Sequence, residues 1–203
     1  MARKRAKSRG STVIEVLMSI TVLAVGAASV MSLQKAAVVA NRRARDLNIA
    51  SAISRTWIER LRSDAMLWNH PSSVNPVSDL NTDTTWLKDH VSDPDPDESA
   101  WFRPTDDSIC GMHDVFGRDE LCTDNTGPYC VNLRLSWVRE QQNMIRAEVR
   151  VYWVARNEGE DALPPDELPC GDLDEPPAVD DLAKKGIFHV VHATTAVTKN
   201  QAH

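Results

Sequence analysis

The chain has 203 residues, of which 42% are apolar, and this is enough for one modest domain with a core and an additional segment. Five basic residues stand in the first ten positions, and no acidic residue accompanies them. Without that leader, 18 basic residues face 29 acidic ones, a formal charge of −11. An acidic domain repels phosphate backbones, which argues against nucleic-acid binding.

Residues 16–33 form an apolar run that contains no charged residue. At about 1.5 Å per residue, a helix of this length spans most of a bilayer core of about 30 Å. The basic leader before it should stay in the cytoplasm, so the rest of the chain lies on the far side. The sequence therefore predicts a single transmembrane segment with an extracytoplasmic C-terminal part.

The apolar run continues into an amphipathic sequence, and no Pro or Gly stands between Gly26 and Pro71. Apolar residues recur there at steps of three and four, which is the spacing of one helix face: Leu47, Ala50, Ile53, Trp57, Ile58 and Leu61. We expect one helix over residues 12–67, about 80 Å long, whose first half lies in the membrane. Residues 68–203 would form the head.

Four cysteines lie in the C-terminal half, at Cys110, Cys122, Cys130 and Cys170. An even number of cysteines among loop-forming residues, outside the cytoplasm, is typical of disulfides. Zinc binding is the alternative, but the chain has no Cys-x-x-Cys pair. Three pairings are possible, and we favour Cys110–Cys122 with Cys130–Cys170.

Glu15 places a carboxylate at the edge of the apolar run. A charge near the bilayer centre costs about 2.5–3.5 kcal/mol, less near the surface, and needs a partner. Glu15 could instead cap the helix start, because Thr12-x-x-Glu15 fits a capping box and an acid suits the positive end of the helix dipole.

The residues Gly10-Ser11-Thr12-Val13-Ile14-Glu15-Val16-Leu17, directly after a basic leader, resemble the cleavage signal of type IV prepilins. The resemblance implies that a prepilin peptidase cuts after Gly10 and methylates the new amino terminus at Ser11. It also implies that Glu15, the fifth residue of the mature chain, pairs with the terminal amine of a neighbouring subunit. The chain departs from the family in having Ser11 where Phe is usual, which bears on the efficiency of cleavage and methylation.

Further along, Leu23-Ala24-Val25-Gly26 and the helix through Trp57-Ile58-Glu59-Arg60-Leu61-Arg62 are similar to the PilV class of minor pilins. They are also similar to the minor pseudopilins of type II secretion. Ser32 occupies the position where many major pilins carry a helix-breaking Pro, so we expect a straight helix. Gly26 has the alternative role of a small residue for close helix packing in lipid.

Two segments of the head alternate between apolar and polar residues, as half-buried strands do, from Cys130 to Trp137 and from Met144 to Ala155. Gln141-Gln142-Asn143 would make the turn between them, and residues 187–197 a third strand. Residues 68–129 are expected to be irregular. The fold class is then α+β, with the long helix packed on an antiparallel sheet in the pilin manner. Trp137 and Trp153 are expected in its core.

Two acidic loops, residues 93–97 and 157–185, are candidates for partner contacts. Asp93, Asp95 and Asp97 could bind calcium, although the EF-hand order is missing and a solvated loop is favoured. His189 and His192 are three apart in a strand and should point to opposite faces. We find no catalytic motif and expect neither enzyme activity nor a cofactor or metal site.

The sequence thus predicts a minor pilin of the inner membrane, with its head in the periplasm. It would enter a surface pilus, help to prime the assembly of that pilus, and so support motility or adhesion. The resemblance implies prepilin peptidase, other minor pilins, the major pilin, a tip adhesin and the inner-membrane assembly platform as partners. A minor pseudopilin is the alternative. A third reading is an anchored extracytoplasmic domain with enzymatic or metal-binding activity that never enters a filament.

Overall fold

The computed structural model describes residues 12–68, 80–88, 91–92, 100–106, 109–121, 127–138, 141–155, 170 and 179–199. The chain forms two compact units, residues 1–46 and Leu47–His203, and we call the second the head unit. Helix α1 (Val13–Ala65) is continuous and contributes to both units. The other elements are listed in chain order: α2 (Leu80–Asp83), β1 (Val91–Ser92), β2 (Met112–His113), β3 (Tyr129–Val138), β4 (Gln141–Val154), α3 (Val179–Lys184) and β5 (Phe188–Thr198).

The long helix and the three C-terminal strands confirm the α+β class. Strands β3, β4 and β5 are antiparallel neighbours, and β1 joins the other side of β3 in parallel. The sheet is therefore mixed, because of a two-residue strand that the sequence did not predict. The expectation that residues 68–129 are irregular was wrong at α2, β1 and β2, and within the acidic loop of residues 157–185 α3 was also missed.

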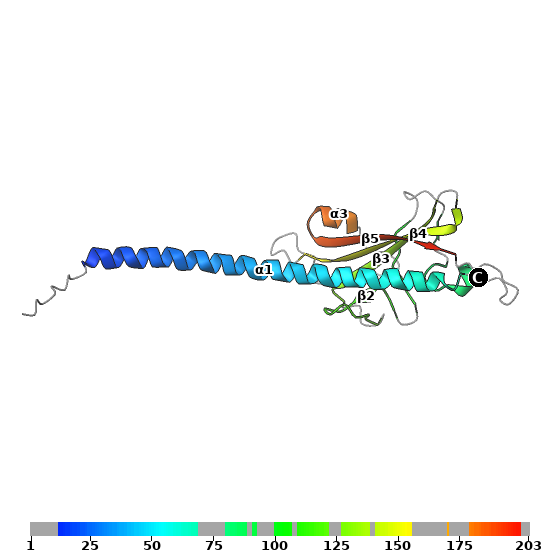
Figure 1. The fold of residues 1–203 in the computed structure, drawn as a ribbon, viewed down its shortest axis with the longest axis horizontal. Helices are drawn as coiled ribbons and strands as arrows, with labels where there is room; N and C mark the ends of the chain where they lie inside the picture. The colour runs from blue at the N-terminus through cyan, green and yellow to red at the C-terminus, as the bar shows by residue number, and fades with distance from the viewer. Residues whose placement is uncertain are drawn as a thin grey trace, which may run out of the picture. The chain divides into compact units, whose positions relative to one another are not determined.

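The main core lies between the sheet and the C-terminal half of α1 (Figure 1). Ile53, Trp57 and Leu61 on α1 are fully covered, as the helical spacing predicted. They pack with one face of the central strands, formed by Val131, Leu133 and Leu135 of β3 and by Ile145, Ala147, Val149 and Val151 of β4. Trp153 is buried in this core and Trp137 packs against it, half-buried, which confirms both placements.

The other face of the sheet is covered as well, so β3 is not the half-buried strand that its alternating sequence indicated. Asn132 and Ser136 point to this face and are buried, with 1% and 5% of their surface exposed. A second apolar cluster lies here, beneath α3, on the opposite side of the sheet from α1 (Figure 1). Its buried residues are Cys110, Met112, Cys130, Tyr152, Cys170, Val179 and Phe188.

The end of α1 is fixed to the chain that follows it by the buried carboxylate of Asp64. Its oxygens accept the backbone N–H groups of Thr85 at 2.8 Å, Trp86 at 2.7 Å and Leu87 at 3.0 Å. The bond to the Leu87 N–H is buried and the bonds to Thr85 and Trp86 are partly buried. A buried N–H group without a partner costs about 1–3 kcal/mol, so Asp64 avoids that cost at Leu87. Strand β4 begins at Gln141, which corrects the predicted turn: residues 141–143 are already in the strand.

Candidate functional site

The first candidate site is the start of α1. The Thr12 carbonyl accepts the N–H of Glu15 at 2.9 Å and of Val16 at 3.3 Å, so the helix begins at the residues that the capping pattern indicated. Glu15 lies in the first turn, and the Ser19 hydroxyl donates to its backbone oxygen at 2.8 Å. A carboxylate in the first turn is favoured by the partial positive charge of the helix terminus. Gly10 and Ser11 lie outside the described residues.

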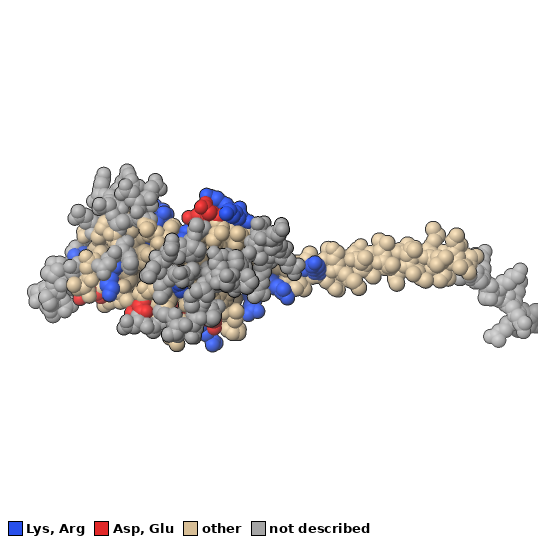
Figure 2. Space-filling model, turned by 180° about the vertical axis from the view of Figure 1, so that it is seen from behind, with Lys and Arg blue, Asp and Glu red and all other residues tan. Residues whose placement is uncertain are grey.

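The surface of α1 after Glu15 is apolar and uncovered. An 18-residue window in this helix has a mean hydropathy of 2.2, and none of that window is buried. The helix is thus long and apolar enough to cross a membrane. Figure 2 shows this part of α1 without Lys, Arg, Asp or Glu. Ser32 lies inside the continuous helix, as expected for a chain without Pro at this position. Arg42, Arg43 and Arg45 follow and are all exposed.

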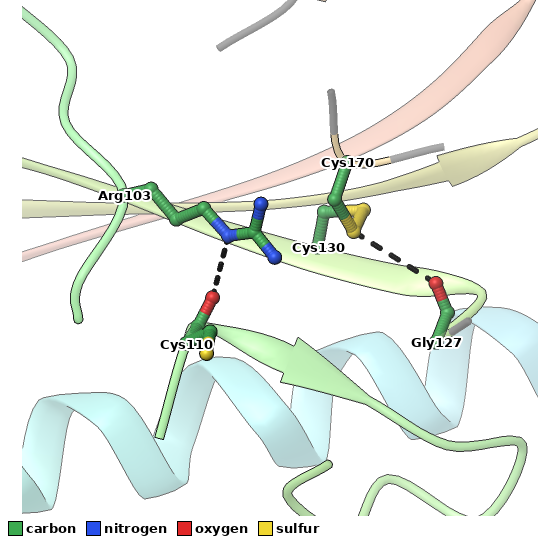
Figure 3. The surroundings of a disulfide bond; sticks show 5 residues. All are labelled: Arg103, Cys110, Gly127, Cys130 and Cys170. Carbon is green, nitrogen blue, oxygen red and sulfur yellow. Dashed lines mark hydrogen bonds between the residues drawn. A yellow bond between two sulfur atoms is a disulfide. The ribbon is translucent and has the colours of Figure 1, made fainter. Parts of the chain in front are cut away.

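The cysteines form the second group of predicted site residues. Cys130 on β3 is bonded to Cys170, with their Cα atoms 5.4 Å apart, which is one of the two bonds favoured from the sequence. Figure 3 shows this bond above Cys110, with the Arg103 side chain to its left. Cys110 is also held in a disulfide, and Cys122, its expected partner, lies outside the described residues.

The surroundings of the Cys130–Cys170 bond are closely packed. The Arg103 Nε donates to the Cys110 carbonyl at 2.6 Å, and burial lowers the pKa of this guanidinium (Figure 3). The Cys170 sulfur lies 3.8 Å from the Gly127 carbonyl oxygen, which is a contact only, because a disulfide sulfur carries no proton. All three described cysteines are buried, so their role in this unit is structural.

A buried polar cluster that the sequence did not reveal joins α1 to β2. The Trp57 Nε1 donates to the His113 Nε2 at 2.9 Å, so the neutral ring carries its proton on Nδ1, 3.5 Å from the Asp119 carboxylate. Arg60 forms an ion pair with Asp119 and lies over the Trp57 ring, 4.7 Å from its centroid. Burial lowers the pKa of His113 to about 4, against the opposing charge of Asp119. His113 is thus an uncharged structural group at neutral pH.

On the opposite face of the sheet, Trp101 lies against two arginines from neighbouring strands. The guanidinium carbons of Arg134 and Arg150 are 4.7 Å and 4.3 Å from its ring centroid. Arg134 pairs with Glu148, whose pKa falls below its ordinary value: the ion pairs with Arg134 and Arg146 outweigh the opposing effect of burial. Arg150 pairs with Asp180 on α3. These contacts fix α3 and the chain before β2 to the sheet.

In the part of the chain that the structure describes, no group of three or more His, Cys, Asp or Glu side chains is placed to hold a metal ion. The calcium candidates Asp93, Asp95 and Asp97 lie outside those residues. His189 and His192 do point to opposite faces of β5, because His189 pairs with Trp153 and His192 with Arg150 on β4.

Comparison of the chain with protein-family models, with curated proteins and with solved structures finds no match.

Proposed function

We propose that this protein is a minor pilin of a type IV pilus, similar to the PilV class. A prepilin peptidase would remove residues 1–10, and the mature chain would wait in the inner membrane with its head unit in the periplasm. The observation that carries the proposal is the start of α1: a basic leader and Gly10 stand directly before a helix with a carboxylate in its first turn and an uncovered apolar surface.

The mechanism follows from two energetic terms. Moving an apolar helix from lipid into a bundle of similar helices costs little, because lipid tails and packed helices are both apolar. Burying Glu15 in that bundle is costly unless the carboxylate meets a cation, and the amino terminus of a neighbouring mature subunit supplies one. The pair would therefore set the axial register of a new subunit when the assembly platform adds it. Other minor pilins, the major pilin and a tip adhesin would be its neighbours.

Replacing Glu15 by Val should leave cleavage intact and lower the amount of this subunit in sheared fibres by about tenfold or more. The reason is that the neighbouring amine then has no carboxylate to pair with. The measurement compares the subunit in the fibre and membrane fractions by immunoblot. Glu59→Val is the matched control, since Glu59 is an exposed carboxylate on the same helix, where it pairs with Arg62. Equal incorporation of the Glu15 variant and the wild type would remove the pairing mechanism.

A further inference from the structure

Strand β5 forms one edge of the sheet, and its own sequence carries none of the residues that usually protect an edge strand. Its 11 residues include no Pro, no Gly and no charged side chain. Its register with β4 runs without interruption from Phe188 to Thr198, whereas the β3–β4 register shifts at Trp137/Val138. Natural sheets blunt such edges with charges, prolines, bulges or short strands, because a long flat edge recruits another strand.

The direction of the free hydrogen-bonding groups of β5 follows from the two ends of the ladder. The Ala155 N–H donates to the Ile187 carbonyl at 2.7 Å, and the Lys199 N–H donates to the Asn143 carbonyl at 2.9 Å. In an antiparallel pair with continuous register, bonded residues alternate along the strand. The odd-numbered residues of β5 therefore bond to β4, and the even-numbered residues aim their N–H and C=O groups at the outer edge: Val190, His192, Thr194 and Ala196.

The two edges of the sheet differ in what covers them. The outer edge of β3 is occupied by β1, by the bridge between Phe102 and Leu133, and by β2. No strand among the described residues pairs with the outer edge of β5. The His192, Thr194 and Ala196 side chains beside that edge are exposed. The β5 edge is thus the place on this sheet where an additional strand can bind.

The charge around β5 limits the kind of strand that fits. No acidic residue follows Asp181 in the chain, and Lys185 and Lys199 flank the strand, while Lys184 pairs with Asp181 at 3.5 Å. On α1, Arg62 donates to the Thr195 hydroxyl at 3.4 Å. An uncharged strand between basic ends is complementary to an extended segment that carries acidic residues at its ends.

A second copy of this chain in the common antiparallel arrangement is disfavoured by the charges at the two ends of β5. Antiparallel pairing of two β5 strands would bring Lys185 of one copy to the end of the pair where Lys199 of the other copy lies, and like charges placed together repel. The complementary strand is therefore expected from a different chain.

We propose that the outer edge of β5 binds an extended, acid-flanked segment of a different filament subunit, which adds as an antiparallel strand. This inference rests on the proposed function, because it names the surface through which this subunit would join its neighbour. Main-chain bonds to the even-numbered residues would supply the affinity, and side chains passing over His192, Thr194 and Ala196 would supply the specificity.

The test removes a single outward N–H. Proline lacks a backbone N–H and is tolerated in edge strands where that group faces outward. Thr194→Pro should leave the full-length protein in the membrane at its normal level and lower its amount in fibres by about tenfold. Thr194→Val, which keeps the N–H, should enter fibres normally. Ala193→Pro removes a bond to β4 and should lower the level of folded protein, which checks the assignment of odd and even residues.

A photoreactive p-benzoylphenylalanine in place of Ala196 tests the same surface without removing an N–H. The expected crosslink joins this position to an extended acidic segment of another filament subunit, identified by peptide sequencing. The same group in place of Thr105, an exposed residue after the Phe102 bridge at the opposite edge, should not give that product.

Two results would overturn the edge proposal alone, provided that the wild-type protein enters fibres. One is that Thr194→Pro enters fibres at the normal level. The other is that the crosslink joins position 196 only to another copy of this chain. If Thr194→Pro does not accumulate in the membrane, the crosslink from position 196 becomes the test of the edge proposal. Assembled fibres without that crosslink would then overturn the proposal. Absence of the wild-type protein from fibres overturns the proposed function, and the edge proposal with it.

Discussion

Replacing Cys130 and Cys170 together by Ala is expected to lower the free energy of unfolding of the head unit by about 4 kcal/mol. The bond closes a loop with a sequence separation of 40 residues, and removing it returns about that much loop entropy to the unfolded chain. The measurement is urea unfolding of the mature full-length chain in detergent micelles, followed by tryptophan fluorescence. The free energy comes from the midpoint and slope of the transition.

The double substitution isolates this bond, whereas a reducing agent would also break the disulfide at Cys110. The control is Thr105→Ala, a change at an exposed residue of the same unit, which should stay within about 0.5 kcal/mol of the wild type. A loss below about 1 kcal/mol in the double variant would mean that the packed second cluster, and not the crosslink, holds Cys170 against β3.

Acidification is expected to cost the head unit about 2 kcal/mol between pH 7 and pH 5 through His113, and about 3 kcal/mol when this residue is fully protonated. The pKa of His113 falls from an ordinary value of 6.5 to about 4 in the fold because the ring is buried. A histidine whose folded pKa is depressed contributes its stability above the unfolded pKa. That stability is lost as the pH falls from 6.5 toward 4. Protonation of Nε2 would also break the bond from Trp57.

The measurement is urea unfolding at a series of pH values between about 7 and about 4.5, the window in which the histidine titrates. His113→Gln is the matched variant, since its side-chain oxygen can accept from Trp57 but does not titrate. His192 also has a pKa lowered by burial and would give a slope of the same sign, so the difference between wild type and variant is the quantity to compare. If the free energy of unfolding falls with pH equally in the two proteins, the prediction is wrong. The protonated His113 ring would then be solvated or paired in the folded protein.

The sequence predicted the elements that have a strong period or a clear composition. The helix was expected over residues 12–67 and runs over Val13–Ala65, because neither Pro nor Gly interrupts its second half. The third strand was expected over residues 187–197 and runs over Phe188–Thr198. The inward face of β4 was identified from alternation alone, and all of Ile145, Ala147, Val149 and Val151 are buried.

The features that were missed depend on residues far apart in the chain. Asn132 and Arg150 lie among polar positions of alternating strands, which indicated an exposed face, yet they are 1% and 3% exposed because segments from elsewhere cover that face. Trp57 and His113 are 56 residues apart, and no spacing rule relates them. Strand β1 has two residues and exists through its pairing with Leu135 and Ser136, so it has no period to detect.

The candidate sites show the same difference between features that are local in the sequence and features that depend on distant residues. Glu15 and the residues before it could be proposed from sequence, because the resemblance to a cleavage signal, the capping pattern and the apolar run are all local. The free edge of β5 could not, since it depends on which strand ends the sheet and on which carbonyls β4 occupies. An uncharged segment rich in β-branched residues was the only local signal of that edge.

The most direct test of the central claim is the intact mass of the protein recovered from cells that express its native prepilin peptidase. We predict a chain that begins at Ser11, with or without one added methyl group, as expected for a processed filament subunit. A stable membrane protein that retains residues 1–10 would contradict the claim and identify an anchored domain that does not enter a filament.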